Sequence, residues 1–369
     1  RDRFGRRTAA LAALRYLVPP LGWLAAERGG SDPLGLACAL AAAWALARGR
    51  PGLSGLALGI GLGARLDLVP LLAPWAVLVR RTPRAAAAGL GAGILLWLVP
   101  LAGFVGPGRL ASLGVEFAGG HFSDWGGSVV TRPGLAERSG AFAWMALAAG
   151  LGTWWPDASP IRLLPTAVLA LGALAFLRRG RSAGDRVVLA TGLVVTAWIF
   201  LAQNLERPRH ALPIVPWALL AVARGLDLVA GRRGWTALAA LSVLPALVDS
   251  ARLVRHHAET EAPARQLVRF VAEVPDRRLV RVYGWESRRV FEVYEPDLDA
   301  RRARSVADLE RDVLGSWVYP SRIYVTSNVR GAPGGRGTWS LVARFRASRY
   351  VFAPDDDLAL YEYVPAVRE

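Results

Sequence analysis

Ionisable side chains interrupt the apolar sequence within residues 201–220, LAQNLERPRHALPIVPWALL. Between its two apolar runs this segment holds Glu206, Arg207, Arg209 and His210. Guanidinium groups hold phosphate oxygens through bidentate, charge-assisted hydrogen bonds. The segment therefore predicts an anion clamp formed by Arg207, Arg209 and His210. The competing interpretation is that these side chains only anchor two helix ends at a membrane interface.

Other polar groups occur in connections that are expected on the same side of the membrane as residues 203–210. Asp32 lies in GGSDPLGL, at the start of an apolar run, and can act as a helix cap, as a ligand, or as both. A carboxylate can serve as a general base toward a hydroxyl, and an Asp–His set can bind a divalent cation. We therefore take Asp32, His121 and Asp124 as candidate catalytic residues, and Asp32 as a candidate metal ligand. The same side would carry Glu27, Arg28, Glu116 and, if its hairpin turns outward, Arg65 with Asp67.

The composition indicates a membrane protein. Of 369 residues, 53% are hydrophobic and only 20% are charged, and the mean hydropathy is +0.30. An ordinary soluble domain is about a quarter charged. We expect a polytopic α-helical membrane protein whose apolar stretches are 8–25, 33–47, 55–79, 85–105, 161–177, 187–202, 211–223 and 235–249.

The excess of basic over acidic residues does not indicate a nucleic-acid partner. The net charge is +16 and all 45 basic residues are Arg, but they gather at the ends of apolar stretches and in the last third of the chain. Cys38 is the single cysteine and excludes a disulfide framework within the chain. The sequence opens RDRFGRR, without Met or a signal-peptide pattern, and we interpret it as lacking an upstream part.

Arginine counts in short connections set the expected topology. The Arg-rich segments 1–7, 48–50, 80–84, 178–186 and 224–233 are assigned to the cytoplasm. This leaves 26–32, 106–160, 203–210 and everything after about 252 outside.

Two segments need special treatment in this topology. The run 51–79 must leave and return on one side, as two short helices broken at Arg65-Leu66-Asp67, unless it is one long helix with Arg65 snorkelling. Residues 106–140 are expected to form a long extracytoplasmic loop at the membrane surface, and 141–155 to continue as an interfacial helix.

The chain is expected to divide into a transmembrane domain, 1–252, and a soluble extracytoplasmic α/β domain, 253–369. Helices are predicted at 262–274, SRRVFEVYEP and SVADLERDVLG, and strands at 278–285, RIYVTSNV, WSLVARF, RYVFA and LALYEYV. GAPGGRG, 331–337, lacks the GK[ST] ending of a phosphate loop and predicts a flexible connection between strands.

Several of these segments resemble one enzyme group. The residues PPLGWLAAERGGSDPLGLACALAAAWAL, GLALGIGLGARLDLVPLLAP, HFSDWGGSVVTRP, LGTWWPD and ERPRHALPIVPWALLAVARGL resemble bacterial polyprenyl-phosphate-dependent glycosyltransferases of the GT-C superfamily. That group includes protein mannosyltransferases and lipid A aminoarabinose transferase. The resemblance spans 10–250, and the R-x-x-LP pattern at Arg209–Pro213, followed by a late soluble domain, carries most of it.

The resemblance implies an inverting sugar transfer from a polyprenyl-phosphate carrier to a lipid, polysaccharide or protein acceptor, at the outer face of a bacterial cytoplasmic membrane. The catalytic Asp of the group follows its first transmembrane helix, a segment that we expect to precede Arg1. Asp32 would match a second acid used for metal or phosphate, and Arg207 and Arg209 would match donor-phosphate contacts, with His210 and Arg65 beside them.

A divalent metal ion is compatible with this chemistry, and no nucleotide cofactor is expected because no Walker or GxGxxG pattern follows a strand. Two other functions stay open. A transporter or flippase for a lipid-linked or anionic substrate would show midplane charges and symmetric halves. A non-catalytic membrane scaffold would use the C-terminal domain to bind partners.

Overall fold

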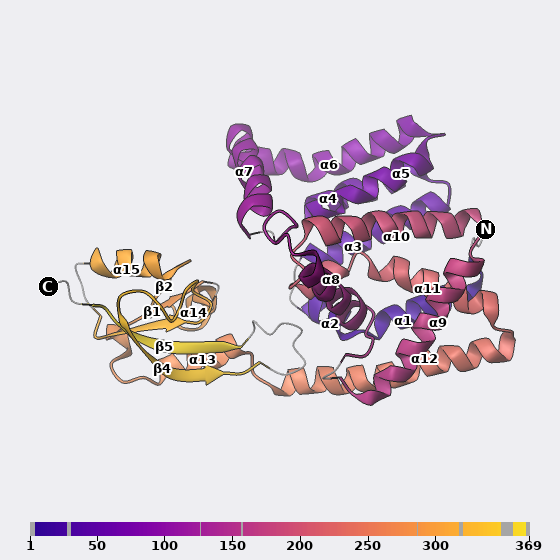
Figure 1. Cartoon of the computed structure of the whole chain (residues 1–369). Helices are drawn as coiled ribbons and strands as arrows, with labels where there is room; N and C mark the ends of the chain where they lie inside the picture. The colour runs from indigo at the N-terminus through magenta and orange to yellow at the C-terminus, as the bar shows by residue number, and fades with distance from the viewer. Residues whose placement is uncertain are drawn as a thin grey trace. The chain divides into compact units, whose positions relative to one another are not determined.

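The computed structural model describes residues 4–27, 31–125, 127–155, 158–285, 287–316, 320–347 and 357–366, without the side chains of 24–27, 124 and 125. The chain divides into two compact units, Arg1–Arg252 and Leu253–Glu369. Figure 1 shows helices in the first unit and a sheet with short helices in the second.

The first unit is built from helices of very different length. In chain order they are α1 (Arg6–Leu17), α2 (Pro20–Glu27), α3 (Ser31–Ala47), α4 (Pro51–Ala64), η1 (Leu66–Leu71), α5 (Leu72–Val79), α6 (Pro83–Val105), α7 (Pro107–Gly120), η2 (His121–Trp125), α8 (Leu135–Ala143), η3 (Trp144–Gly150), η4 (Pro160–Arg162), α9 (Leu163–Arg179), α10 (Ala183–Ala202), η5 (Pro208–Ala211), α11 (Val215–Val229) and α12 (Arg232–Glu259).

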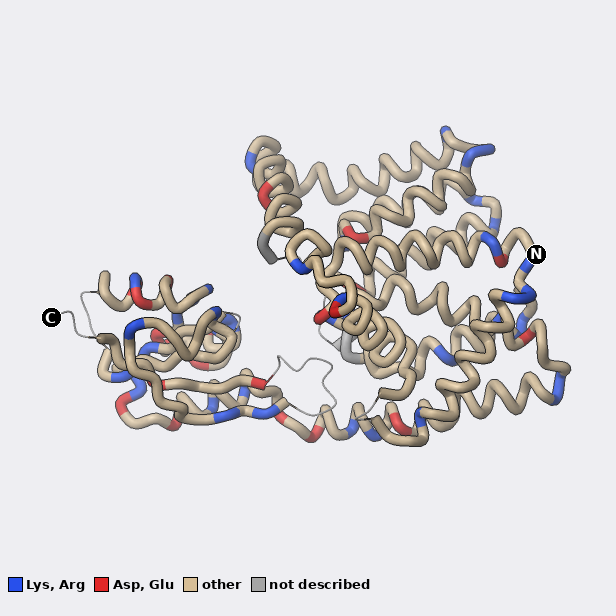
Figure 2. The backbone as a smooth tube through the Cα atoms, in the orientation of Figure 1, with Lys and Arg blue, Asp and Glu red and all other residues tan. Residues whose placement is uncertain are grey.

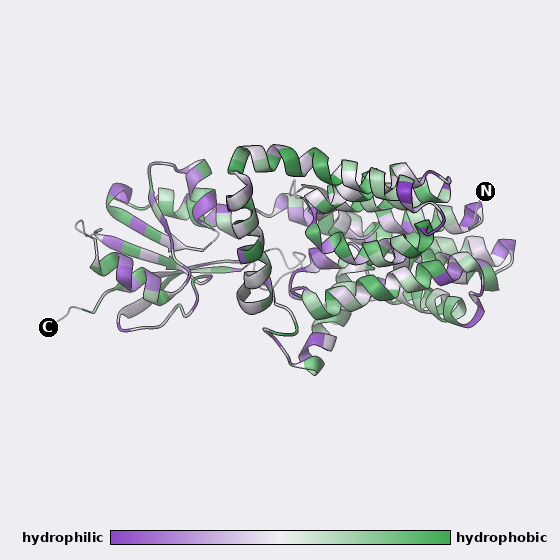
Figure 3. Cartoon of the chain, turned by 90° about the horizontal axis from the view of Figure 1, so that it is seen from above, coloured by the Kyte–Doolittle hydropathy of each residue, from purple (hydrophilic) through white to green (hydrophobic). Residues whose placement is uncertain are grey.

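Some of these helices are long enough to cross a membrane. Among the described residues, four helical segments are long and apolar enough to cross a membrane: Pro83–Val105, Pro160–Arg179, Ala183–Ala202 and Arg232–Ala272. Shorter apolar helices occupy Ser31–Ala47, Pro51–Ala64 and Leu66–Val79. Figure 3 shows hydrophobic residues along the helices of the first unit and hydrophilic residues mainly at the helix ends. The fold is therefore the expected helical membrane type, with fewer full-length spans than the eight apolar stretches.

Glycines allow the backbones of α4 and α6 to touch. A Cβ added at Gly55 would lie 2.2 Å from the Ala86 carbonyl oxygen, and one at Gly93 would lie 2.4 Å from the Leu56 carbonyl oxygen. Helices in a membrane associate through such close packing because water supplies no hydrophobic driving force there. The two glycines thus fix α4 against α6 and hold the end of α4 in place.

The run 51–79 is broken where the charged residues predict it. Helix α4 ends at Ala64, Arg65 is extended with φ −149° and ψ 108°, and η1 follows. Charged side chains in mid-run favour such a break because a chain turn leaves room for partners that a continuous helix excludes. The alternative of one long helix is wrong.

The expectation of a long loop at 106–140 is corrected. Helix α7 occupies Pro107–Gly120, and α8 follows at Leu135–Ala143. The apolar residues Leu110, Leu113 and Phe117 recur at helical spacing, but four glycines between 106 and 119 obscure the pattern. The predicted helix at 141–155 is right only as far as Gly150, where η3 ends.

The second unit is an α/β domain. Strands β1 (Val280–Gly284), β2 (Asp299–Arg302), β3 (Arg322–Thr326), β4 (Thr338–Phe345) and β5 (Leu358–Val364) form a sheet in the order β2-β1-β3-β5-β4. Strands β1, β2 and β3 are parallel, whereas β5 pairs antiparallel with β3 and β4. Helices α13 (Pro263–Ala272), α14 (Arg288–Tyr294) and α15 (Val306–Leu314) complete it.

Most elements of this unit match their predicted positions. The three helices and the strands β1, β3, β4 and β5 fall where the patterns place them, and 331–337 connects β3 to β4. Strand β2 was missed because its sequence, DARR, has no apolar residue except Ala300. The predicted strand RYVFA, 349–353, lies outside the described residues.

Charge separates the two ends of the helical unit. Figure 2 shows Arg-bearing turns at one end, beside the N-terminus, where α3, α5, α9 and α11 each connect to the next helix. The break at Arg65 and the turn after α10 lie at the other end. This is the arrangement that alternate crossing of a membrane requires, and the assignment of the Arg-rich end to the cytoplasm stays a prediction.

Candidate functional site

A buried ion-paired cluster lies where α4 breaks. The Arg65 Nε atom donates to Asp67 Oδ1 over 2.8 Å, and Nη2 pairs with the second oxygen of the same carboxylate. Nη1 pairs with Asp32 Oδ1 at the first turn of α3. The three side chains are only 10 to 13% exposed. Two carboxylates thus share one guanidinium, and the cluster of Asp32, Arg65 and Asp67 carries one surplus negative charge.

A glycine one turn after Asp32 makes room for this pairing. A Cβ at Gly35 would lie 2.9 Å from the Arg65 Cγ atom, closer than a real contact allows. Any larger residue would push the Arg65 side chain away from α3. The spacing of Asp32 and Gly35 therefore positions both the acid and the path of its partner.

His210, in the short helix η5, lies close to the same cluster. Its Nδ1 atom is 2.8 Å from the Asn204 carbonyl oxygen, which only accepts, so Nδ1 carries the hydrogen. Burial, followed by the positive charge of Arg65, lowers the pKa of His210 to about 4. At neutral pH the imidazole is uncharged, and Nε2 carries the lone pair.

The segment 121–138 holds the C-terminal end of α10, from which the His210 turn departs. His121 Nε2 donates to the Ala202 carbonyl oxygen over 2.6 Å, and the Val129 N–H donates to the Leu201 carbonyl oxygen over 2.8 Å. The buried Arg138 donates to the carbonyl oxygens of Phe200, Gln203 and Gly127. The last carbonyls of a helix have no partner within it, and these donors supply one.

This arrangement gives the predicted site residues different positions. His121 caps α10, and the side chain of Asp124 lies outside the described part of the chain, as do those of Glu27 and Arg28. Arg207 directly precedes η5 and Arg209 lies within it, and both are exposed. Glu116 is exposed on α7. Glu206 pairs with Arg132 at the surface. The structure therefore joins Asp32, Arg65 and His210, with Arg207 and Arg209 on the turn beside them.

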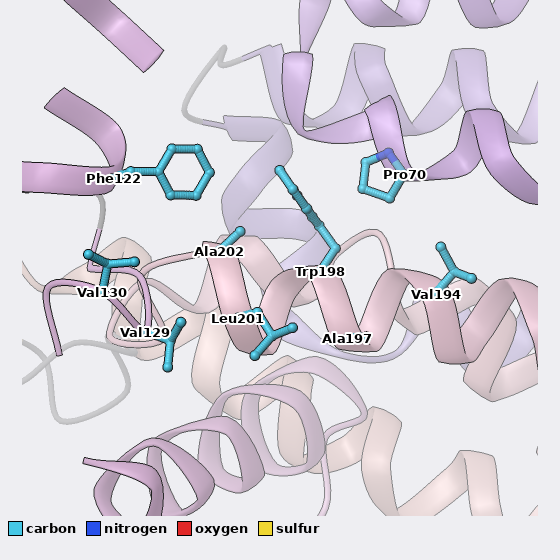
Figure 4. Close-up of a pocket in the computed structure, with 9 residues that line it drawn as sticks. All are labelled: Pro70, Phe122, Val129, Val130, Val194, Ala197, Trp198, Leu201 and Ala202. Carbon is cyan, nitrogen blue, oxygen red and sulfur yellow. The ribbon is translucent and has the colours of Figure 1, made fainter. Parts of the chain in front are cut away.

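An apolar pocket of about 370 Å³ adjoins this charged region. Figure 4 shows Trp198 between Phe122 and Pro70, and the Phe122 and Trp198 ring centroids are 6.5 Å apart with the rings nearly perpendicular. Pro70 belongs to η1, three residues after Asp67, and Ala202 is the residue whose carbonyl His121 caps. The full lining is Pro70, Phe122, Val129, Val130, Val194, Ala197, Trp198, Leu201 and Ala202.

No ready-made metal centre occurs in the described residues, where no three His, Cys, Asp or Glu side chains come together to hold an ion. Asp32 is paired with Arg65 instead. Sequence reasoning missed Arg138, Asn204 and Trp198, because a donor to helix-end carbonyls, a backbone carbonyl and a pocket-lining ring leave no pattern in the sequence. Only the placement of Arg138 within a glycine-rich polar segment could have drawn attention to it.

The fold and this region define a class. The chain is a helical membrane protein with a charged cluster and an apolar pocket side by side at one end of its helical unit. The profile of glycosyltransferase family 87 matches residues 1–203. The chain belongs to this family, and so to the membrane glycosyltransferases. No curated protein and no solved structure matches it significantly. The family match includes Asp32, Arg65 and Asp67 and ends just before the turn that carries His210.

Proposed function

We propose that the chain transfers a sugar from a polyprenyl-phosphate donor to an acceptor hydroxyl at the extracytoplasmic face, as an inverting enzyme of the GT-C type. One observation carries the proposal: a cluster with a surplus carboxylate adjoins an apolar pocket in a chain of a glycosyltransferase family. A lipid carrier has the matching chemistry, because its head is polar and its chain is apolar.

Asp32 is the proposed general base. The Arg65 guanidinium pairs with Asp67 and with Asp32. One guanidinium serves two carboxylates, so the cluster keeps one negative charge in excess and Asp32 can take a proton. The acceptor oxygen attacks the anomeric carbon, the bond from that carbon to the phosphate oxygen breaks, and polyprenyl phosphate leaves with the electron pair. The acceptor proton passes to Asp32.

The departing phosphate needs positive charge, which Arg207 and Arg209 can supply from the exposed turn. Arg65 was expected to join them, but its pairing with two carboxylates suits it to hold Asp32 in place. A neutral His210 whose Nε2 carries the lone pair can accept a hydrogen bond from a sugar hydroxyl. A divalent ion at Asp32 would have to recruit its other ligands from the substrate or from outside the described residues.

The pocket suits the carrier chain. Its lining is apolar, with one potential donor, the Trp198 Nε1 atom, which is buried without a partner. The pocket opens beside η1 and the end of α10, so an isoprenoid chain there would bring its phosphate near the turn 203–210. We place this face outside a bacterial-type cytoplasmic membrane, together with the C-terminal domain. The sugar is a hexose or pentose, and the acceptor is a lipid, polysaccharide or protein.

The test is transfer of radiolabelled sugar from synthetic polyprenyl-phosphate hexoses and pentoses, in membrane vesicles that contain the full chain. D32N should lower transfer by about 10²- to 10⁴-fold, the usual contribution of a general base. R207A/R209A should abolish transfer at unchanged expression. R178A/R179A is the matched control, because it removes two exposed arginines from the opposite end.

Each variant decides a different part of the proposal. Full transfer by D32N would remove Asp32 as the base, and full transfer by R207A/R209A would remove the clamp. If the unmodified chain used none of these donors, the donor assignment would be overturned. Equal losses in R178A/R179A would show that charge removal alone explains the effect.

A further inference from the structure

Two buried arginines lie outside the site described above. Arg15 on α1 and Arg162 in η4 are each only 1% exposed. They are close enough for the charge of Arg162 to act on Arg15. Burial of a guanidinium is costly unless it is paired and its hydrogen bonds are satisfied. The partners of these two groups therefore matter.

Their partners satisfy only part of their hydrogen-bonding capacity. Arg15 Nη2 donates to the Leu151 carbonyl oxygen over 2.8 Å, while Nε and Nη1 have no partner in the part of the chain that the structure describes. Arg162 Nε pairs with Asp249 on α12, while neither of its Nη atoms has a partner among the same described residues. Four buried N–H-bearing nitrogens are thus left over, two from each side chain.

The charge of the group is also unbalanced. Arg15 and Arg162 bring two positive charges, and Asp249 brings one negative charge. The Trp155 ring, 4.6 Å from the Arg162 guanidinium carbon, offers only its electron-rich face. Among the described residues, one positive charge therefore stays uncompensated, together with the four nitrogens that have no partner.

A monoanion with several acceptor oxygens would correct both deficits. A phosphodiester carries a single negative charge and presents two unesterified oxygens that match guanidinium forks. A phosphate monoester, close to a dianion at neutral pH, would leave a surplus negative charge. We propose that Arg15 and Arg162 form a second anion site that binds a phosphodiester, the group that links the head of a membrane phospholipid to its chains.

The location is suited to a lipid head. Arg162 is at the start of the membrane-length segment Pro160–Arg179, and Trp155 is half-buried, so the cluster is next to a helix end and to the surface. A Cβ at Gly150 would lie 3.1 Å from the Cβ of Ala211, the neighbour of His210. The Leu151 carbonyl that holds Arg15 thus follows directly on a segment packed against η5. This site does not depend on the transfer chemistry.

The test is binding by the full chain in detergent, followed by native mass spectrometry and by the melting temperature. The probes are dihexanoyl phosphatidylglycerol, its head group glycerophosphoglycerol, inorganic phosphate, and dihexanoylglycerol as a chain without phosphate. R15Q removes one cation. R162Q/D249N removes an ion pair without leaving an unpaired carboxylate. R109Q removes an exposed arginine of the same unit as a control.

We expect phosphatidylglycerol to bind and to raise the melting temperature, and R15Q and R162Q/D249N to weaken binding by about ten- to a hundredfold, with R109Q unchanged. Without probe, R15Q should melt no lower than the unmodified chain, because it removes an uncompensated charge. A purely structural arginine would instead lower the melting temperature in every condition.

The probes also identify the source of the anion. Binding of the lipid alone indicates a lipid head, and equal binding of glycerophosphoglycerol indicates a free phosphodiester; both support the site. Binding no stronger than that of dihexanoylglycerol, or unchanged in both arginine variants, would overturn it. Preference for inorganic phosphate over both diesters would also overturn it.

Discussion

Two charged clusters in the helical unit have opposite compositions. Asp32 and Asp67 share the single guanidinium of Arg65, whereas Asp249 pairs with Arg162 and leaves the nearby Arg15 without an ion pair among the described residues. Both clusters are buried. Arg65 in the first cluster and Asp249 in the second each form an ion pair with a residue of the opposite charge. Among the described residues, the first cluster keeps one negative charge in excess, and the second keeps guanidinium nitrogens without a hydrogen-bond partner.

The difference shows that the sign of the surplus charge, more than the presence of an ion pair, indicates what each cluster can bind. A surplus carboxylate suits proton transfer and contact with a developing positive charge at a sugar carbon. A surplus guanidinium suits an anion. A balanced pair would indicate neither, because buried pairs also occur as purely structural features.

The largest effect on stability should follow removal of Arg65, the one positive charge in the first cluster. R65M leaves two buried carboxylates without a partner and should cost about 3–5 kcal/mol of stability, the range for breaking a buried pair. The measurement is the apparent melting temperature of the detergent-solubilised chain.

The matched variant is R65M/D32N/D67N, which removes all three charges. It should melt well above R65M, because it leaves no uncompensated charge, although it should not transfer sugar. If both variants melted alike, the contribution of charge balance to this cluster would be disproved.

An intermediate effect is expected at Gly35. G35A places a Cβ against Arg65 Cγ and should cost about 1–3 kcal/mol, as overpacking usually does. It should also reduce transfer, because Asp32 loses its contact. G91A, on α6 with nothing within 4 Å of the added Cβ, is the control and should be neutral or slightly stabilising. A harmless G35A would contradict the packing described here.

The smallest effect concerns His210. Its folded-state pKa, about 4, is below the ordinary value of 6.5, so the unfolded chain binds more protons between these two pH values. This contribution to stability is therefore complete above about pH 6.5 and is lost as the pH falls toward 4. H210N keeps a donor toward Asn204 and should flatten the melting temperature in that window. An unchanged pH profile would contradict the depressed pKa.

The sequence predicted the first cluster better than the second for a physical reason. Arg65 and Asp67 interrupt an apolar run, so their charge demands a chain break and partners close by. Arg162 and Asp249 lie at the ends of the apolar stretches 161–177 and 235–249, where a charged side chain normally faces water or lipid heads. Arg15 lies inside the stretch 8–25, which has no acidic residue that could mark a nearby partner. Only tertiary packing joins positions separated by more than eighty residues in the chain.

The same distinction holds for the fold. Apolar stretches predicted the helices and the division of 51–79, because both follow from local pattern. The capping of α10 by His121, Val129 and Arg138 could not be predicted, since carbonyl groups at a helix end leave no trace in the sequence. Strand β2 was missed for a related reason: its pairing with β1 sets its conformation, and its own composition does not.

Both clusters are expected at the end of the helical unit that faces away from the cytoplasm. The direct test labels single cysteines in intact cells, in a C38A background, with a membrane-impermeant maleimide. S123C lies near the His210 end, and G231C lies in the connection between α11 and α12, where an added Cβ meets nothing. The account predicts that S123C reacts in intact cells and that G231C reacts only after permeabilisation. Reaction of G231C in intact cells, or protection of S123C until permeabilisation, would contradict it.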